Sequence, residues 1–159
     1  MGRMYTASFA PTAQTAAVDA FELLAPSDSI LRIHRIRLWQ TTDLGDAAEE
    51  VLNVTMTRGT GSVTSGSGGA TPDIHPLDDG DSAFGGTIEC RNTTQLAVGT
   101  GTLEVLDRAG WNIRIPFELV YTPEERPIIT PGDYWALGVS APADSVTWGG
   151  SITFEELGG

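Results

Sequence analysis

The sequence predicts an all-β protein: an antiparallel, jelly-roll-like β-sandwich of eight or nine short strands. Short runs of alternating apolar and polar residues recur along the chain, which is the pattern of half-buried strands. The 159 residues include 19 Gly and 9 Pro, and this favours many turns over long helices. The length fits a single domain, and no repeat with a period of about 20 to 50 residues is present. A two-sheet immunoglobulin-like topology is the alternative.

The N-terminal residues 1–11 are expected to form an arm or an edge strand. The alternation over Tyr5–Phe9 is weak and stops at Pro11. The sandwich domain is expected to span 12–155, followed by a short tail at 156–159. Because little pattern ties residues 1–11 to a core, we expect their removal to weaken attachment to a partner and to leave the domain folded.

The run Ile30–Trp39 is the clearest strand, and it contains a change of phase. Apolar residues occupy odd positions in its first half and even positions after residue 35. A regular strand would turn part of this apolar set outward, because successive side chains point to opposite faces. We therefore predict a β-bulge near Ile33 and His34, which would restore the register.

The remaining strands follow from the same alternation: Ala16–Leu24, Val51–Arg58, Thr87–Arg91, Thr102–Leu106, Trp111–Tyr121, Tyr134–Val139 and Val146–Phe154. A hairpin turn is expected at 107–110, directly before Trp111–Tyr121. That run has the most regular alternation in the chain, and Pro116 within it indicates an edge strand or a bulge. Residues 47–52 could make one helical turn capped by Asp46.

A long loop rich in Gly, Ser and Asp extends from residue 59 to residue 86. It exceeds the usual length of a connection, so we expect a surface excursion with a mobile midpoint. Near its end, Asp78, Asp79 and Asp81 offer oxygen ligands for calcium. Their spacing does not match an EF-hand loop, and no metal site is predicted.

Charge and cysteine content exclude several kinds of partner. The net charge is −12 and all nine basic residues are Arg, so a polyanion such as nucleic acid would be repelled. Cys90 is the only cysteine, which excludes an intramolecular disulfide framework and fits assembly in the cytoplasm. The sequence shows no secretory signal and no apolar run long enough for a membrane span, so no membrane partner is expected.

Common catalytic signatures are missing from the sequence. No serine lies in a Gly-x-Ser-x-Gly elbow, and the Gly-rich run lacks the Lys of a phosphate-binding loop. His34 and His75 are the only histidines, and they do not form the clustered His-x-His motif of cupin metal sites. The glutamates that occur as neighbouring pairs would point to opposite faces of a strand. We therefore expect no enzymatic activity, no catalytic residue, no metal and no cofactor.

Two groups of residues are candidates for binding a partner. One is the apolar set in the N-terminal segment, and the other is the arginine row on the Ile30–Trp39 strand, the most positive patch in an acidic chain. Interfaces are enriched in Arg and aromatic residues, so these strands also suggest self-association. The candidate partner-binding residues are Met4, Tyr5, Phe9, Arg32, Arg35 and Arg37.

Five segments carry a resemblance to a known group of proteins. Residues 4–9, 21–26, 64–72, 122–127 and 141–145 have the sequences Met-Tyr-Thr-Ala-Ser-Phe, Phe-Glu-Leu-Leu-Ala-Pro, Thr-Ser-Gly-Ser-Gly-Gly-Ala-Thr-Pro, Thr-Pro-Glu-Glu-Arg-Pro and Ala-Pro-Ala-Asp-Ser. With them the chain resembles small proteins of tailed-phage and prophage structural modules. The resemblance implies a non-enzymatic virion protein, namely a capsid decoration (cement) protein. Such a protein would bind the major capsid protein on the outer head surface after assembly in the host cytoplasm.

The three-fold positions of capsid lattices suggest a homotrimer for such a protein. The alternative function is a glycan-binding β-sandwich module of a tail fibre or receptor-binding apparatus. That function would require exposed aromatic side chains over a groove. The candidates for this role are Trp39, Trp111, Trp135 and Trp148.

Overall fold

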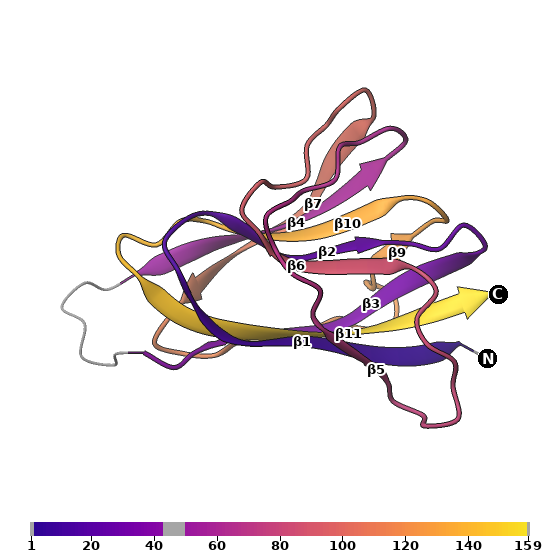
Figure 1. The fold of residues 1–159 in the computed structure, drawn as a ribbon, viewed down its shortest axis with the longest axis horizontal. Coiled ribbons are helices and arrows are strands. Elements are labelled where there is room, and N and C mark those ends of the chain that lie inside the picture. Colours follow the sequence, from indigo (N-terminus) through magenta and orange to yellow (C-terminus); the bar gives the residue numbers. More distant parts are fainter. Residues whose placement is uncertain (1, 43–49, 159) are drawn as a thin grey trace.

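The computed structural model describes residues 2–42 and 50–158, which form eleven strands in two antiparallel sheets (Figure 1). Sheet A has the order β5-β1-β11-β3-β8, with β9 also paired to β3, and sheet B has the order β6-β2-β10-β4-β7. The predicted all-β sandwich is confirmed, with eleven strands in the described residues instead of eight or nine. The strands are β1 (Arg3–Gln14), β2 (Val18–Leu24), β3 (Ser29–Gln40), β4 (Val51–Thr60), β5 (Asp73–Pro76), β6 (Thr87–Asn92), β7 (Thr102–Asn112), β8 (Phe117–Val120), β9 (Ile128–Ile129), β10 (Tyr134–Val139) and β11 (Val146–Gly158).

Eight of these strands pair in a nested order, first with last. β1 pairs with β11, β2 with β10, β3 with β8 and β4 with β7. Successive pairs alternate between the sheets, since β1 and β3 lie in sheet A and β2 and β4 in sheet B. The chain thus follows a single long hairpin that is wrapped into the two layers of the sandwich.

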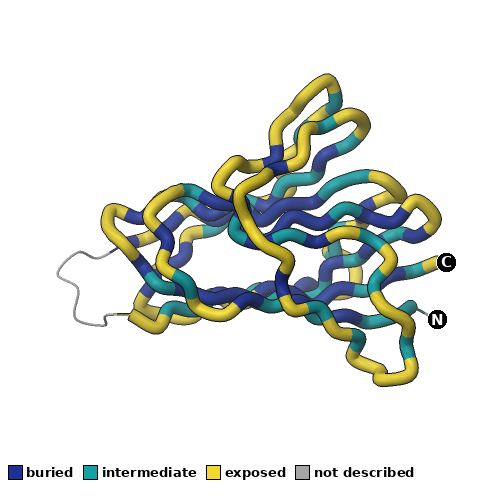
Figure 2. The backbone as a smooth tube through the Cα atoms, in the orientation of Figure 1, coloured by how far each residue is buried: buried dark blue, intermediate teal, exposed yellow. Residues whose placement is uncertain are grey.

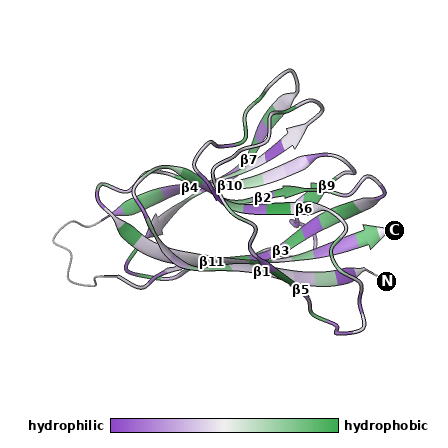
Figure 3. Ribbon diagram, in the orientation of Figure 1, coloured by the Kyte–Doolittle hydropathy of each residue, from purple (hydrophilic) through white to green (hydrophobic). Residues whose placement is uncertain are grey.

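The core lies between the two sheets. Buried residues gather on the facing strands, while loops and hairpin tips are exposed (Figure 2). On β3 hydrophobic and hydrophilic residues alternate, as expected for a strand with one buried face (Figure 3). Residues 2–42 and 50–158 include no helix long and apolar enough to cross a membrane.

The predicted bulge in β3 is confirmed. Phe154 of β11 pairs with Ile33 and Thr153 pairs with Arg35, so His34 is the extra residue. The bulge keeps Leu31, Ile33 and the later apolar residues of β3 on the buried face. The change of phase in the sequence is thereby absorbed by one unpaired position.

The N-terminal segment is neither an arm nor an edge strand, which corrects the expectation for residues 1–11. β1 lies inside sheet A, between β11 and β5. Tyr5 stacks on Phe154 with ring centroids 5.6 Å apart, and the Phe9 ring centroid lies 5.5 Å from that of Trp148. The alternation was weak because the outward residue Met4 is apolar and the strand has a bulge after Phe9.

The C-terminal residues also differ from expectation. β11 continues to Gly158, and Glu156, which was expected in a short tail, is buried. The pairing of β11 with both β1 and β3 holds this end in the sheet. Of the helical turn expected at 47–52, residues 47–49 lie outside the described residues, and Val51 and Leu52 belong to β4.

The run from Trp111 to Tyr121 is not one strand, which corrects another expectation. β7 ends at Asn112 in sheet B, and β8 begins at Phe117 in sheet A. Between them the Ile115 amide donates to the Asn112 carbonyl at 3.0 Å, and Pro116 has no amide hydrogen to continue a ladder. The apolar alternation persists through the turn, although the side chain of Ile115 is 63% exposed.

The expected hairpin turn at 107–110 is also wrong, because these residues lie within β7. They pair with β4 in a ladder that shifts register between Met56 and Thr57, which leaves Leu106 as the extra residue of a bulge. A strand interrupted by a bulge tolerates Gly110 and the charged residues that a turn would also favour. One end of the β4–β7 pair projects away from the rest of the molecule (Figure 1).

In the long loop, the midpoint that was expected to be mobile is hydrogen-bonded to residues 90–97 in and beside sheet B, and β5, in the same loop, joins sheet A. Ser67 and Thr94 exchange two backbone hydrogen bonds of 2.9 and 3.0 Å, and Ala70 and Cys90 exchange two more. At Gly66 an added Cβ would lie 2.5 Å from the Thr94 carbonyl oxygen, so a residue without a side chain permits this close approach. We call residues 64–70 the strap.

Two buried carboxylates of β2 hold the strap and the segment beside it. Glu22 accepts hydrogen bonds from the Ser65 hydroxyl and from the Gly66 amide. Asp19 accepts hydrogen bonds from the Leu96 amide at 2.7 Å and from the Gln95 side chain at 3.0 Å. Each of these residues is 3% exposed, so these donors replace the hydrogen bonds that water would otherwise make to the carboxylate oxygens.

Asp19 should make stability depend on pH. Burial raises its pKa to about 6, although the hydrogen bonds from Leu96 and Gln95 oppose the shift. Because the folded state binds this proton more tightly, the contribution of Asp19 is greatest below pH ~4 and falls by about 3 kcal/mol as the pH rises to ~6. Asp19→Asn should remove this fall, since an amide does not titrate and Gln95 can rotate to accept from it. Urea unfolding of both proteins between pH 4 and 7 measures the difference, and parallel stability curves would contradict the assignment.

Candidate protein-binding surface

The outer side of sheet A carries three rows of side chains set by strand register. Residues paired across neighbouring strands share one face, so each row runs from β1 through β11 and β3 to β8 or β9. We call this surface the sheet A face. Its rows are Ser8, Ser151, Arg37 and Glu118; then Thr6, Thr153, Arg35 and Val120; then Met4, Glu155, Arg32 and Ile128.

The three arginines of this face have no ion-pair partner among the described residues. Arg58 forms an ion pair with Glu104 in sheet B, and within the described chain Glu155 contacts His34 and not an arginine. Arg35 donates a long hydrogen bond of 3.5 Å to the Thr153 hydroxyl. In a chain of net charge −12, unpaired guanidinium groups on a strand face are available to an acidic partner.

His34 lies at the bulge and adds little positive charge to the sheet A face. Its Nε2 is 3.3 Å from a carboxylate oxygen of Glu155. Burial lowers the pKa of His34, and the nearby charge of Arg126 lowers it further, whereas Glu155 opposes the shift. The imidazole is therefore neutral at neutral pH, and the arginines supply the positive charge.

A pocket opens beside the sheet A face. It lies where the segment between β8 and β9 turns away from β3, the strand with which both of them pair. Opposite the bulge, the Tyr121 amide donates to the His34 carbonyl at 3.0 Å, and the Ile33 amide donates to the Pro127 carbonyl at 3.1 Å. Residues 122–126 turn away from the sheet between these two hydrogen bonds. The pocket has a volume of about 530 Å³.

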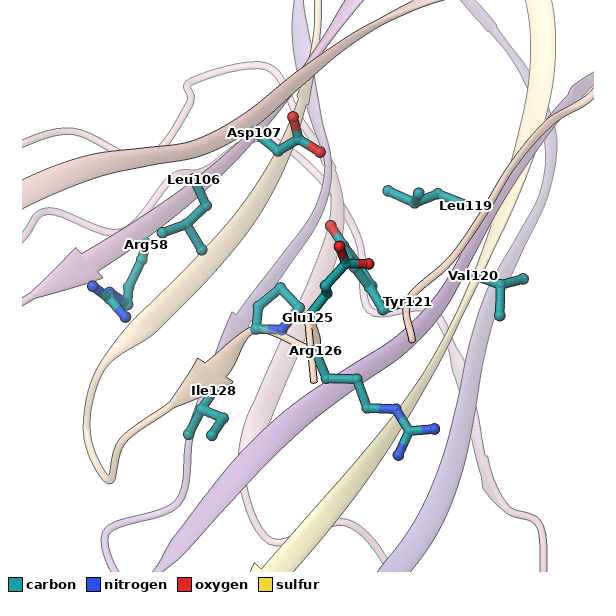
Figure 4. Close-up of a pocket in the computed structure, with 10 residues that line it drawn as sticks. Arg58, Leu106, Asp107, Leu119, Val120, Tyr121, Glu125, Arg126 and Ile128 are labelled. Carbon is teal, nitrogen blue, oxygen red and sulfur yellow. The ribbon is translucent and has the colours of Figure 1, made fainter. Parts of the chain in front are cut away.

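Segments of both sheets line this pocket. Arg58 and Leu106 of sheet B lie on one side of it, Leu119 and Val120 of sheet A lie on the other, and Tyr121 lies between them (Figure 4). The pocket borders the three arginines of β3, because Val120 pairs with Arg35. It is therefore apolar where it meets the sheet A face beside Arg35, and its lining also includes the carboxylates of Asp107 and Glu125.

Tyr121 and Arg126 bring buried polar atoms to the pocket. The Tyr121 hydroxyl and the Arg126 Nε are buried and have no hydrogen-bond partner within the described chain. Tyr121 is 9% exposed, and burial, with the charge of Asp107, raises its pKa to about 12. The hydroxyl stays protonated at physiological pH, so it can donate a hydrogen bond to a group that enters the pocket.

The structure brings together four of the six residues predicted to bind a partner. Met4, Arg32, Arg35 and Arg37 all lie on the sheet A face. Tyr5 and Phe9 point instead into the core, where they are 0% and 5% exposed.

The pocket residues Tyr121, Arg126 and Ile128 were missed because they come from a turn and a two-residue strand. The Thr-Pro-Glu-Glu-Arg-Pro turn, with Ile directly after it, was the only signal in the sequence that could have located them.

The tryptophans do not provide the platform that a glycan-binding module needs. Trp111, Trp135 and Trp148 are at most 1% exposed, and Trp39 is half-buried. Within residues 2–42 and 50–158, no group of three or more His, Cys, Asp or Glu side chains is placed to hold a metal ion.

Fold and surface together define an all-β sandwich with a polar, arginine-bearing sheet face beside an apolar pocket. No family model matches the sequence, and no curated protein matches it. Two solved structures show distant likenesses. One is the crystal structure of the T13 IBDV viral particle, at 9% identity and a TM-score of 0.22, covering 99% of this chain and 40% of that chain. The other is the structure of infectious bursal disease virus Gt strain, at 14% identity and a TM-score of 0.16, covering 99% and 41%.

This chain therefore spans about 40% of the length of the chains it matches. Neither likeness is close enough to inform fold or function.

Proposed function

We propose that the protein is a non-enzymatic structural component of a phage virion, a capsid decoration protein that binds the major capsid protein on the outside of the head. It acts as a homotrimer assembled in the host cytoplasm. The virion setting rests on the resemblance of five sequence segments to phage and prophage structural-module proteins. The observation that supports binding through a defined surface is the row of unpaired arginines, Arg32, Arg35 and Arg37, on the sheet A face.

Charge supports this orientation of the protein on a particle. A net charge of −12 opposes binding to packaged DNA and fits the outer side of a head. On the sheet A face the β11 neighbours of Arg35 and Arg37 are the small side chains of Thr153 and Ser151, whereas the neighbour of Arg32 is Glu155. An acidic patch on the capsid is the matching partner surface.

Composition of the particle tests the virion role directly. Particles purified from the phage or induced prophage that encodes the chain should contain it in many copies, counted by mass spectrometry. Electron microscopy should place its density on the outer head surface. Absence from purified particles would refute the proposal, and density confined to the tail tip would favour the glycan-binding module instead.

Charge reversal at Arg37 should weaken attachment. Arg37 is the exposed arginine of the sheet A face, so Arg37→Glu should raise the dissociation constant for depleted particles about tenfold and reduce its salt dependence. Sedimentation of particles with labelled protein at two salt concentrations measures both effects. Arg108→Glu, at an exposed arginine of β7 in sheet B, is the matched control. Equal losses for both variants would show that net charge, and not this face, governs attachment.

A further inference from the structure

Two complementary surfaces lie at opposite edges of sheet A. The pocket lies at the β8 and β9 edge, and the loop that follows β5 lies at the other edge. In Figure 1 this loop extends below the sheet beside β5. One chain cannot bring its own loop to its own pocket, because β1, β11 and β3 lie between them.

The loop at residues 77–82 presents an apolar side chain next to three carboxylates. Leu77 is 59% exposed and is followed by Asp78, Asp79 and Asp81. Among the described residues, none of these aspartates forms an ion pair. An exposed leucine beside unpaired negative charge matches the side of the pocket where Val120 and Ile128 lie next to Arg35 and Arg32.

The loop is also held in place, which lowers the entropy lost on docking. The Leu77 amide donates to the Met4 carbonyl at 2.8 Å, and the Gly80 amide donates to the Asp78 side chain at 2.9 Å. The Tyr5 hydroxyl donates to the Ser82 carbonyl at 2.8 Å. A loop fixed at both ends and at its centre presents Leu77 in a defined position.

The pocket has exposed apolar side chains at its edge and a hydrogen-bond donor without a partner in the described part of the chain. Val120 and Ile128 are 63% and 43% exposed at its edge, next to Arg35 and Arg32. Inside it, the Tyr121 hydroxyl has no partner within the described chain although the residue is 9% exposed. A donor of this kind is satisfied by a water molecule or by a group of a docked partner.

We propose that the 77–82 loop of one copy docks into the pocket of a second copy. Leu77 enters the apolar hollow beside Val120 and Ile128, and the aspartates face the arginines at its edge. The Tyr121 hydroxyl donates to a main-chain carbonyl of the loop. This contact deepens the proposed self-association by naming its two surfaces, and it does not depend on a virion location.

The contact joins two different surfaces, so it is heterologous. Each copy has one loop and one pocket, and repetition of the same contact closes into a ring if the rotation allows. A closed ring of three would be the proposed homotrimer. Since both surfaces are charged, the contact weakens at high salt.

Light scattering of the purified full chain at micromolar concentration gives the first test. At low salt the mass should be a multiple of the 16.8 kDa chain. Leu77→Arg and Val120→Asp should each raise the dissociation constant about 100-fold, because each puts a charge against a surface of the same sign and removes an apolar contact. Val98→Arg and Val51→Asp are matched controls, since both valines are more than half exposed, at 52% and 63%, and lie outside the loop and the pocket. Thermal unfolding should show all four variants folded.

Mixing the two disrupted variants distinguishes a heterologous contact from a symmetric one. Leu77→Arg keeps an intact pocket and Val120→Asp keeps an intact loop, so an equimolar mixture should form a 1:1 heterodimer and no ring. Leu77→Cys and Val120→Cys should likewise be joined by a short thiol crosslinker when mixed, because the native Cys90 is buried.

Three results would overturn the proposal. They are a wild-type monomer mass at low and high salt, an oligomer mass unchanged by Leu77→Arg, and crosslinking of Leu77→Cys only to itself. If the protein forms no loop-to-pocket contact in solution but is still incorporated normally into particles, this inference is refuted and the proposed virion role is not.

Discussion

Removal of residues 1–11 is expected to unfold the protein. The deletion takes away most of β1, an interior strand, and with it the buried side chains of Tyr5 and Phe9. Loss of one large buried aromatic residue costs about 3–5 kcal/mol, so two losses reach the total stability of about 5–15 kcal/mol of an ordinary domain. The deletion also leaves β11 without its partner on one side.

Circular dichroism and thermal unfolding of the truncated chain measure this outcome. Alanine at the outward-facing Thr6 and Ser8 is the matched control, because it changes the same strand without touching the core. That control should unfold within a few degrees of the wild type. A truncated chain with a cooperative transition near the wild-type temperature would show that β1 is dispensable.

Glu22→Ala should release the strap from sheet B. The buried carboxylate accepts from the Ser65 hydroxyl, from the Gly66 amide and from the Asn92 side chain. Hydrogen bonds to charged groups contribute about 1.5–3 kcal/mol each and are not additive, so we expect a loss of about 3 kcal/mol. Part of this loss comes from the Gly66 amide, which stays buried without an acceptor.

Hydrogen exchange at the Gly66 and Ser67 amides reports strap release directly. Both amides should exchange faster in Glu22→Ala, ahead of global unfolding. Glu89→Ala is the matched control, because Glu89 is only half-buried and accepts one hydrogen bond from the Asn92 side chain. Equal protection in both variants would show that other contacts hold the strap.

Periodicity in the sequence located most strands and the bulge of β3. In β3 the apolar residues change from odd to even positions. Only a bulge keeps both sets on the buried face, because one of them would otherwise face solvent. The same reasoning failed for Trp111–Tyr121, where the parity continues through a turn between sheets. Alternation reports which side is buried and does not report which sheet a residue joins.

Less of the candidate binding surface could be predicted. The arginines of β3 were found because they occupy consecutive outward positions on one strand. Met4 lies on the same face because β1 pairs with β11, near the other end of the chain, and β11 pairs with β3. The pocket combines β4, β7 and the segment from β8 to β9, and no local pattern reports such a meeting. Burial of Tyr5 and Phe9 depended on the last strand, β11, which a weak local alternation cannot indicate.

The nested pairing of strands sets the order in which the chain can fold. The innermost pair, β4 with β7, is separated by far fewer residues than the outermost pair, β1 with β11. Since closure of long loops is slow, the inner hairpin can form early, and β1 must wait for residues 146–158 to leave the ribosome. During synthesis β1 lacks β11 and, of the strands described, has only the four-residue β5 as a pairing partner, so Tyr5, Ala7 and Phe9 stay exposed and a nascent chain stalled before residue 146 should be prone to aggregation.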